Sequence, residues 1–343
     1  MTPQKFSNIL VIQPMPGIGD MIWFVPHIRA IAHHFSKTGK VSLLARPSAH
    51  AATLLSEEDS VGDIIPLYRC QMNRQGQERD PHHRTLYKHD GVMGLYQLGQ
   101  DLALKNFDAT WILDRRAYYT MAAFLAGIPH RFGLGFGVDK ILLQSPLLNK
   151  QYHKMHARDR ATHFLEAFNI QISDFEYPLK ISKKDLLKRK IPQKDNIWVC
   201  LGIGASEQEK KWPVGCFAGL INILCQKGIT CFICGGPGEK EEAAAIKKVA
   251  GKAYESKVHT ITDWTVMETA ALMTQSDFYV GNDTFLYNLA ALQGKKALSI
   301  SGVVPSHTYR PEMMTIWSQK GVQHVTPQQV LKKLMNETFL VCS

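Results

Sequence analysis

Short apolar runs alternate with longer amphipathic stretches along most of the chain. The runs are rich in β-branched and large aliphatic residues, as buried strands are, and the stretches between them space their apolar residues as helices do. Eight runs are expected to be strands: residues 8–13, 41–45, 63–68, 109–113, 197–202, 229–234, 278–280 and 296–300. Because alternating strands and helices build βαβ units, the sequence predicts an α/β fold with parallel sheets.

The alternation lapses between about residues 170 and 196, where a proline-containing and strongly charged stretch interrupts the pattern. Such a stretch between two periodic regions is typical of a linker. We therefore expect a Rossmann-like domain at 1–173, a linker at 174–195 and a second Rossmann-like domain at 196–343, with ligands at the carboxyl ends of the strands. A final helix should start near residue 326, because Thr326-Pro327 is a good N-cap and first-position pair.

The chain carries a formal charge of +10, which indicates an anionic partner such as nucleic acid, a phosphorylated glycolipid or a bilayer surface. No nucleic-acid partner is expected, because the chain lacks the interleaved basic and aromatic residues of an RNA-binding sheet and the pattern of a recognition helix. Basic residues gather at 69–84 and again at Arg115 and Arg116. They form either an anion-binding rim or a solvated loop, and the aperiodic stretch 71–90 is expected to overhang the ligand site.

Nothing in the sequence predicts a membrane span or a secreted scaffold. No run approaches the ~18 consecutive apolar residues that a span needs, and the first ten residues lack an apolar signal core, so we expect a cytoplasmic protein. Seven scattered cysteines do not make a disulfide framework. Cys231 and Cys234 lie three apart in a predicted strand, so they point to opposite faces, and neither a metal site nor a redox site is expected.

The first predicted strand runs into a glycine-containing turn with an aspartate. Gly17 and Gly19 allow the backbone to turn sharply and approach a ligand, and a helix should open at Asp20 or just after it. The third glycine of a dinucleotide fingerprint is absent, which argues against NAD binding. Asp20 is either a helix cap or a catalytic carboxylate.

Three turns in the second half carry polar groups at the ends of predicted strands. Ser206 and Lys210 follow strand 197–202 and could hold phosphate oxygens, or they could belong to a solvated loop. Glu239 and Glu241 could accept ribose hydroxyls, or they could be first-turn helix acids.

The third of these turns, after strand 278–280, is the segment 281–284, Gly-Asn-Asp-Thr. Free amides at the helix start there favour a diphosphate, although a plain N-cap explains Asp283 as well.

In order and spacing, these motifs resemble glycosyltransferase family nine, the lipopolysaccharide heptosyltransferases. Segments 107–133, 156–168 and 262–268 share the resemblance, so it covers nearly the whole chain. It implies a GT-B fold, in which two Rossmann-like domains face a central cleft. It also implies inverting, metal-independent transfer of a heptose or related sugar from an ADP-sugar to a lipopolysaccharide core or similar anionic glycan. It further implies a Gram-negative source and a peripheral location on the inner face of the cytoplasmic membrane.

The resemblance also assigns roles to individual residues. Asp20 would be the general base, Ser206 and Lys210 would hold the diphosphate, and Glu239 or Glu241 would meet the ADP ribose. The remaining substrate-binding candidates are Gly17, Gly19, Arg115, Arg116, Gly281, Asn282, Asp283, Thr284, Phe285 and Asn288.

Three positions depart from the pattern of the family. Phe285 stands where a glycine usually follows the Asp-Thr pair, Asn288 replaces a histidine, and Asp263 replaces a glycine. Phe285 would turn either into the core or into the sugar pocket. Two alternatives therefore stay open beside heptose transfer: a different sugar on the nucleotide, or a non-catalytic nucleotide-sugar-binding or assembly subunit of the same fold.

Overall fold

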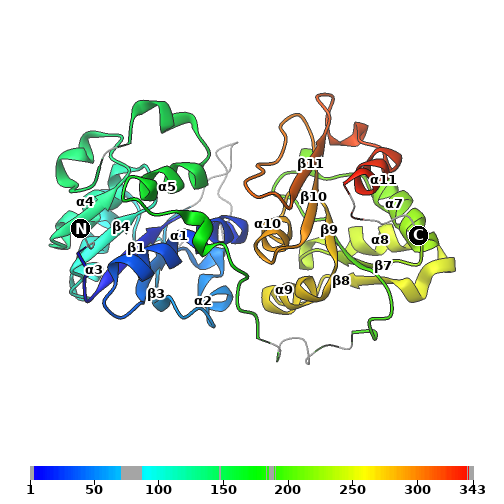
Figure 1. Ribbon diagram of the computed structural model, residues 1–343, viewed down its shortest axis with the longest axis horizontal. Coiled ribbons are helices and arrows are strands. Elements are labelled where there is room, and N and C mark those ends of the chain that lie inside the picture. The colour runs from blue at the N-terminus through cyan, green and yellow to red at the C-terminus, as the bar shows by residue number, and fades with distance from the viewer. Residues whose placement is uncertain are drawn as a thin grey trace. The chain divides into compact units, whose positions relative to one another are not determined.

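The computed structural model describes residues 4–70, 87–146, 148–182, 184, 189, 191–337 and 339. The chain divides into two compact units, Met1–Tyr177 and Pro178–Ser343. Each unit has one parallel sheet with helices packed against it (Figure 1). The predicted α/β class with two parallel sheets is confirmed.

The sheet of unit 1 has the order β3-β2-β1-β4-β5. Leu10 and Ile12 of β1 pack with α3 and α4 on one face, where Leu98 and Tyr119 are buried. The strands are β1 (Ile9–Gln13), β2 (Val41–Ala45), β3 (Val61–Pro66), β4 (Ala109–Ile112) and β5 (His130–Gly133), and the helices are α1 (Ile18–Phe35), α2 (Ala51–Leu54), α3 (Gly91–Ala103), α4 (Ala117–Leu125) and α5 (Ala157–Glu166).

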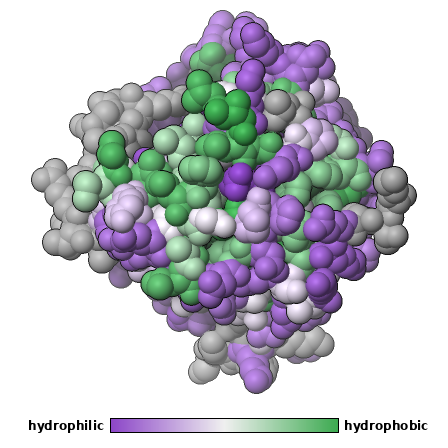
Figure 2. Space-filling model, turned by 90° about the vertical axis from the view of Figure 1, so that its left-hand side faces the viewer, coloured by the Kyte–Doolittle hydropathy of each residue, from purple (hydrophilic) through white to green (hydrophobic). Residues whose placement is uncertain are grey.

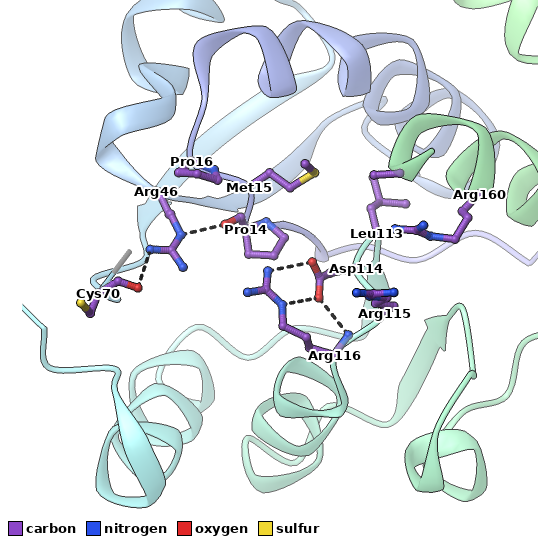
Figure 3. Close-up of a pocket in the computed structure, with 11 residues that line it drawn as sticks. Pro14, Met15, Pro16, Arg46, Cys70, Leu113, Asp114, Arg115, Arg116 and Arg160 are labelled. Atoms are coloured by element: carbon purple, nitrogen blue, oxygen red, sulfur yellow. Dashed lines mark hydrogen bonds and ion pairs between the residues drawn. The ribbon is translucent and has the colours of Figure 1, made fainter. Parts of the chain in front are cut away.

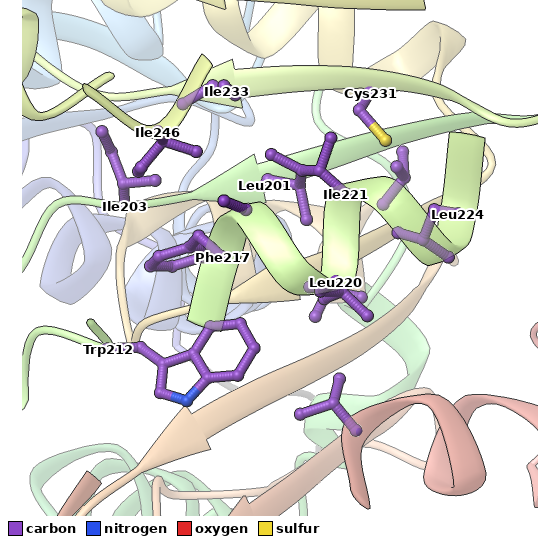
Figure 4. Packing of buried hydrophobic residues seen from close by; sticks show 14 of the residues in the cluster. Leu201, Ile203, Trp212, Phe217, Leu220, Ile221, Leu224, Cys231, Ile233 and Ile246 are labelled. Carbon is purple, nitrogen blue, oxygen red and sulfur yellow. The ribbon is translucent and has the colours of Figure 1, made fainter. Parts of the chain in front are cut away.

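The sheet of unit 2 has the order β11-β10-β9-β6-β7-β8. Phe217 and Leu220 of α7 are buried against this sheet together with Leu201 and Ile233 (Figure 4). The strands are β6 (Trp198–Gly202), β7 (Thr230–Cys234), β8 (Val258–Ile261), β9 (Phe278–Gly281), β10 (Lys296–Ser301) and β11 (Met313–Trp317), and the helices are α7 (Val214–Gln226), α8 (Lys240–Ala250), α9 (Val266–Gln275), α10 (Phe285–Leu292) and α11 (Pro327–Asn336).

The boundary of unit 1 lies a few residues inside the expected linker. Arg29 of α1 is buried, pairs with Glu58 at 2.6 Å and donates to the carbonyl oxygens of Phe175 and Tyr177 at 3.2 and 2.6 Å. A buried guanidinium needs all of these acceptors, so residues 174–177 belong to unit 1.

Strands β5, β8 and β11 did not appear among the predicted strands. The helix expected after Thr326 is α11, and the Thr326 hydroxyl caps it by accepting the N–H of Gln329 at 3.2 Å. None of the described helices has the length and hydrophobicity that crossing a bilayer requires.

Candidate active site

Asp20 lies in the first turn of α1, whose N-cap is Gly17. Its Oδ2 accepts the N–H of Gly17 at 2.9 Å, and a Cβ at Gly17 would lie only 2.8 Å from that oxygen. The helix therefore begins at Ile18, two residues before the predicted start, because the carboxylate reaches back to the cap. The side chain stays partly exposed, so Asp20 holds the helix start and keeps access to solvent.

A pocket of about 400 Å³ opens at the carboxyl ends of β1, β2 and β4 in unit 1 (Figure 3). Four arginines and one aspartate supply its charged groups, so it suits an anionic ligand. Asp20 is not in its wall, although Gly17, to which Asp20 is hydrogen-bonded, directly follows the lining residue Pro16. The pocket is lined by Pro14, Met15, Pro16, Arg46, Cys70, Leu113, Asp114, Arg115, Arg116, Ala157 and Arg160.

The two adjacent arginines of the pocket have different surroundings. Arg116 pairs with both oxygens of Asp114, at 2.7 and 2.8 Å. Burial lowers the pKa of Arg116, but the hydrogen bond and charge of Asp114 outweigh burial and raise it. Arg115 is exposed and has no hydrogen-bonding partner among the described residues. Arg115 is thus the cation of this pair that is available to a ligand.

Arg46 and Arg160 are pocket residues that sequence reasoning missed. The Arg46 Nε donates to the carbonyl of Pro14 at 2.8 Å, and burial lowers the pKa of this guanidinium. Arg160 donates to the carbonyl of Met155. Arg46 directly follows a correctly predicted strand, which is the signal that could have found it. Arg160 had no comparable signal, because it lies inside a helix.

The basic segment 69–84 is described only at its start. Arg69 pairs with Asp90 at 3.3 Å and stacks on the ring of Tyr118 at 3.8 Å. It is therefore tied into unit 1. The other basic residues of this segment, Arg74, Arg79, His82, His83 and Arg84, lie outside the described residues.

In unit 2, the loop after β6 brings Ser206 and Lys210 together. The Lys210 ammonium lies 3.5 Å from the Ser206 hydroxyl and 3.3 Å from the Glu207 carboxylate, and its side chain is 46% exposed. It also interacts electrostatically with Asp283, whose carboxylate has a hydrogen bond with Ser306. An ammonium and a hydroxyl suit phosphate oxygens, whereas the Asp283 carboxylate suits sugar hydroxyls.

Lys211 has a different environment from its neighbour. Its ammonium pairs with Glu242 at 2.8 Å and Glu239 at 3.4 Å. Burial lowers the pKa of Lys211, but these two carboxylates outweigh it and raise that pKa. Glu239 also accepts the N–H of Gly236 at 2.9 Å and lies beside the loop after β6, whereas Glu241 is exposed on α8. Of the two candidates for the ribose, Glu239 is the one placed next to the loop of Ser206.

Gly281 and Asn282, which are expected to contact ligand, hold the end of β9 against the end of β6. Gly281 has a φ of 151°, and a Cβ there would lie 2.3 Å from the Gly202 carbonyl oxygen. Asn282 is fully buried, accepts the N–H of Trp212 at 3.0 Å and donates to the Ile203 carbonyl at 2.6 Å. Both groups of its side-chain amide are thus hydrogen-bonded inside the protein, and a ligand contact by Gly281 or Asn282 stays a prediction.

The start of α10 carries two of the departures from the family pattern. Thr284 caps the helix by accepting the N–H of Leu286 at 3.2 Å. Asn288 is buried, donates to the Thr284 carbonyl at 3.4 Å and accepts from the Tyr309 hydroxyl at 3.2 Å, and these bonds support the helix start. Phe285 is the first residue of α10, and its side chain is only half-buried.

The third departure, Asp263, follows β8. Its carboxylate pairs with Arg189 at 3.3 Å, and the same guanidinium pairs with Glu268 at 3.0 Å. This position therefore connects the segment before β6 to the start of α9.

The model of glycosyltransferase family 9 (heptosyltransferase) matches residues 95–335. The chain belongs to this family. The matched segment of this family 9 chain includes the arginine pair after β4 and all of the turns described in unit 2, whereas Asp20 lies before it.

Among curated proteins, the lipopolysaccharide core heptosyltransferase OpsX of Haemophilus influenzae is 22% identical over 218 residues. The match spans 62% of this chain and 62% of the relative, so it covers less than two thirds of the length of that protein.

Solved structures of family 9 proteins share the fold over almost their whole length. The family 9 glycosyl transferase of Veillonella parvula superposes with a TM-score of 0.76 at 16% identity, covering 99% of both chains. ADP-heptose lps heptosyltransferase II of E. coli gives a TM-score of 0.71 at 19% identity, covering 97% of this chain and 98% of that one. The E. coli heptosyltransferase WaaC with ADP gives 0.65 at 14% identity, covering 97% and 98%.

Proposed function

We propose that this family 9 chain is an inverting, metal-independent glycosyltransferase that moves a heptose from ADP-heptose to an anionic lipopolysaccharide-core acceptor. We place the reaction on the inner surface of the cytoplasmic membrane. The observation that carries the proposal is the arginine pocket in unit 1, which opens beside the start of the helix that bears Asp20. Support for the donor comes from the solved E. coli relative, which is a heptosyltransferase with ADP.

In this proposal Asp20 is the general base. It takes the proton of the acceptor hydroxyl, whose oxygen forms a bond to the anomeric carbon while the bond from that carbon to the ADP oxygen breaks. The N–H of Gly17 fixes one carboxylate oxygen and stabilises the ionised form, which a base requires. Such a base contributes roughly 10²–10⁴-fold in rate.

The leaving ADP takes up charge that unit 2 stabilises. Lys210 and Ser206 supply an ammonium and a hydroxyl, and the amides at the start of α10 supply further donors. Because these groups carry the charge stabilisation in this proposal, no metal ion is needed. Phe285 is half-buried and lies two residues after Asp283 in the sequence, and in this proposal its side chain shapes the sugar pocket.

The alternative of a non-catalytic nucleotide-sugar-binding subunit has less support. Both groups assigned to chemistry, Asp20 and Lys210, are present and reach solvent. Asn288, which replaces the histidine of the family pattern, is hydrogen-bonded inside unit 2. The replacement therefore leaves in place the solvent-accessible groups that the proposed reaction uses.

The proposal is tested by the acceptor kinetics of Arg115→Gln. Loss of one charge-assisted hydrogen bond, about 1.5–3 kcal/mol, should raise the KM for a lipopolysaccharide-core acceptor roughly ten-fold or more and leave the KM for ADP-heptose unchanged. Lys332→Gln, an exposed change of the same charge on α11, is the control and should alter neither. An unchanged acceptor KM, or an equal rise in both KM values, contradicts the assignment.

A further inference from the structure

Unit 1 has a surface on which large apolar side chains gather in solvent. Nine of the sixteen exposed large hydrophobic residues in the described part of the chain lie on α3, on α4 and on the short helix η3 (Val138–Leu142), or directly after α3. Figure 2 shows apolar side chains gathered on this side of the molecule, with hydrophilic ones around them. We call this surface the apolar face; its residues are Val92, Met93, Tyr96, Leu104, Met121, Phe124, Leu125, Val138 and Ile141.

These residues form one surface because their elements pack together. A Cβ at Gly99 of α3 would lie 2.9 Å from the Cβ of Leu125 in α4, so the two helices are in close contact. The Thr120 hydroxyl of α4 donates to the buried Asp139 carboxylate of η3 at 2.9 Å. That bond holds η3 on α4 with Val138 and Ile141, each 82% exposed, pointing into solvent.

The apolar face departs from the usual composition of a solvated helix surface. A surface helix normally turns charged residues outward, but α4 contains no charged residue and α3 contains only Asp101. Asp101 is paired with Lys88 at 2.6 Å. A contiguous exposed apolar surface marks a protein or membrane contact.

The charges around the apolar face decide between these two partners. The Arg131 guanidinium lies 5.5 Å from the ring of Phe124, and Lys140 stands between Val138 and Ile141. Lys105 follows Leu104, and both lysines are exposed. The nearby carboxylates of Asp101 and Asp139 are engaged by Lys88 and Thr120. Cations among exposed apolar side chains complement an anionic bilayer surface, whereas two copies of this face would bring their cations together.

We propose that the apolar face docks unit 1 onto an anionic phospholipid bilayer, with its hydrophobic side chains entering the headgroup region. Arg116 is the N-cap of α4 and also lines the arginine pocket. Docking through α4 therefore brings that pocket to the membrane surface. This last consequence rests on the proposed function, because it gives the pocket a membrane-anchored anionic glycolipid as its ligand.

The test is sedimentation of the full chain with vesicles of phosphatidylglycerol and phosphatidylcholine, or of phosphatidylcholine alone, without donor or acceptor. Wild type should bind the anionic vesicles, and raised salt should weaken binding. The triple variant Val92→Ser/Val138→Ser/Ile141→Ser should bind at least about ten-fold more weakly, since each side chain loses its hydrophobic transfer. Lys105→Glu/Lys140→Glu should lose a similar factor.

The matched control is Val303→Ser/Val304→Ser, which changes two exposed valines of unit 2 and should bind as wild type does. Circular dichroism melting verifies that each variant is folded. Unchanged vesicle binding in the folded triple variant overturns the proposal, as does equal binding to both vesicle types. A concentration-dependent dimer that the triple substitution dissociates, seen by analytical ultracentrifugation, also overturns it and assigns the face to a second copy.

The two proposals fail separately in this design. Vesicle binding needs no turnover, so it is measurable even if the chain transfers no sugar. Conversely, the triple variant should retain wild-type turnover on a detergent-dispersed acceptor, because none of its three positions lies in the arginine pocket or the loops of unit 2.

Discussion

Two neighbouring lysines in the loop after β6 have opposite environments, and this difference makes a prediction at the scale of single residues. Lys210 is solvent-exposed beside Ser206, while Lys211 is held by Glu239 and Glu242. Lys210→Ala should weaken ADP binding by about ten-fold or more, because a charge-assisted bond to a diphosphate is worth about 1.5–3 kcal/mol.

The adjacent variant Lys211→Ala is the matched control. It should change ADP affinity little and lower the melting temperature slightly instead, since its partners lie within the protein. Isothermal titration of ADP into both variants checks the pair. A larger affinity loss in Lys211→Ala would assign the diphosphate to the other lysine.

At the same scale, sequence reasoning found polar residues after strands but not what they do. Asp20, Lys210 and Asp283 could be located because each lies in the turn that follows a predicted strand, three to eight residues after the strand ends. Asn282 looked equivalent in the sequence, yet its side-chain amide is hydrogen-bonded to the backbone of Trp212 and Ile203. These bonds depend on how two loops that are distant in the sequence meet. Burial of a polar side chain is a tertiary property, so motif spacing could not separate the two cases.

At the scale of elements, the interior strands were predictable and most of the edge strands were not. All eight predicted runs overlap observed strands. The three missed strands, β5, β8 and β11, each lie at the edge of a sheet. An edge strand is covered less completely, so polar and half-exposed residues interrupt its apolar run, as His130 and Arg131 do in β5. The edge strand β3 was found because Ile64 and Ile65 retain the pattern.

The contact between α1 and α5 predicts a dependence of stability on pH. His27 of α1 is completely buried, and its Nε2 lies 2.9 Å from the Thr162 hydroxyl of α5. Burial, with the charge of Arg158, lowers the pKa of His27 from 6.5 to about 3. The folded protein therefore keeps His27 neutral, while the unfolded chain binds a proton below pH 6.5.

Stability should consequently fall as pH drops from 6.5 towards 3, by about 1.4 kcal/mol per pH unit from this group. Between pH 7.5 and 5, the free energy of unfolding of wild type should fall by about 2 kcal/mol more than that of His27→Gln, which cannot titrate there. Urea unfolding of both proteins at the two pH values measures the difference. Parallel pH profiles would mean that His27 is protonated in the folded state.

At the scale of the whole molecule, the division into two α/β units, each with a parallel sheet, follows from the repeated pattern and its lapse near residue 180. The arginine pocket cannot be predicted from that pattern. Its walls come from four separate segments of the chain, around residues 14–16, 46, 113–116 and 157–160, together with Cys70. Only the pair Arg115 and Arg116 could be recognised from sequence. The rest depends on the strand order β3-β2-β1-β4-β5, which places the ends of β1, β2 and β4 side by side.

The central claim is sugar transfer from ADP-heptose with Asp20 as the base, and one measurement tests it directly. Purified wild type and Asp20→Asn are given ADP-heptose and a lipopolysaccharide-core acceptor, and released ADP and glycosylated acceptor are quantified, with ADP affinity measured in parallel. Wild type should form both products in equal amounts. Asp20→Asn should be about 10²–10⁴-fold slower with nearly unchanged ADP affinity, because the base acts on the acceptor proton. Transfer by Asp20→Asn within a few fold of wild type, or no transfer by wild type, would contradict the account.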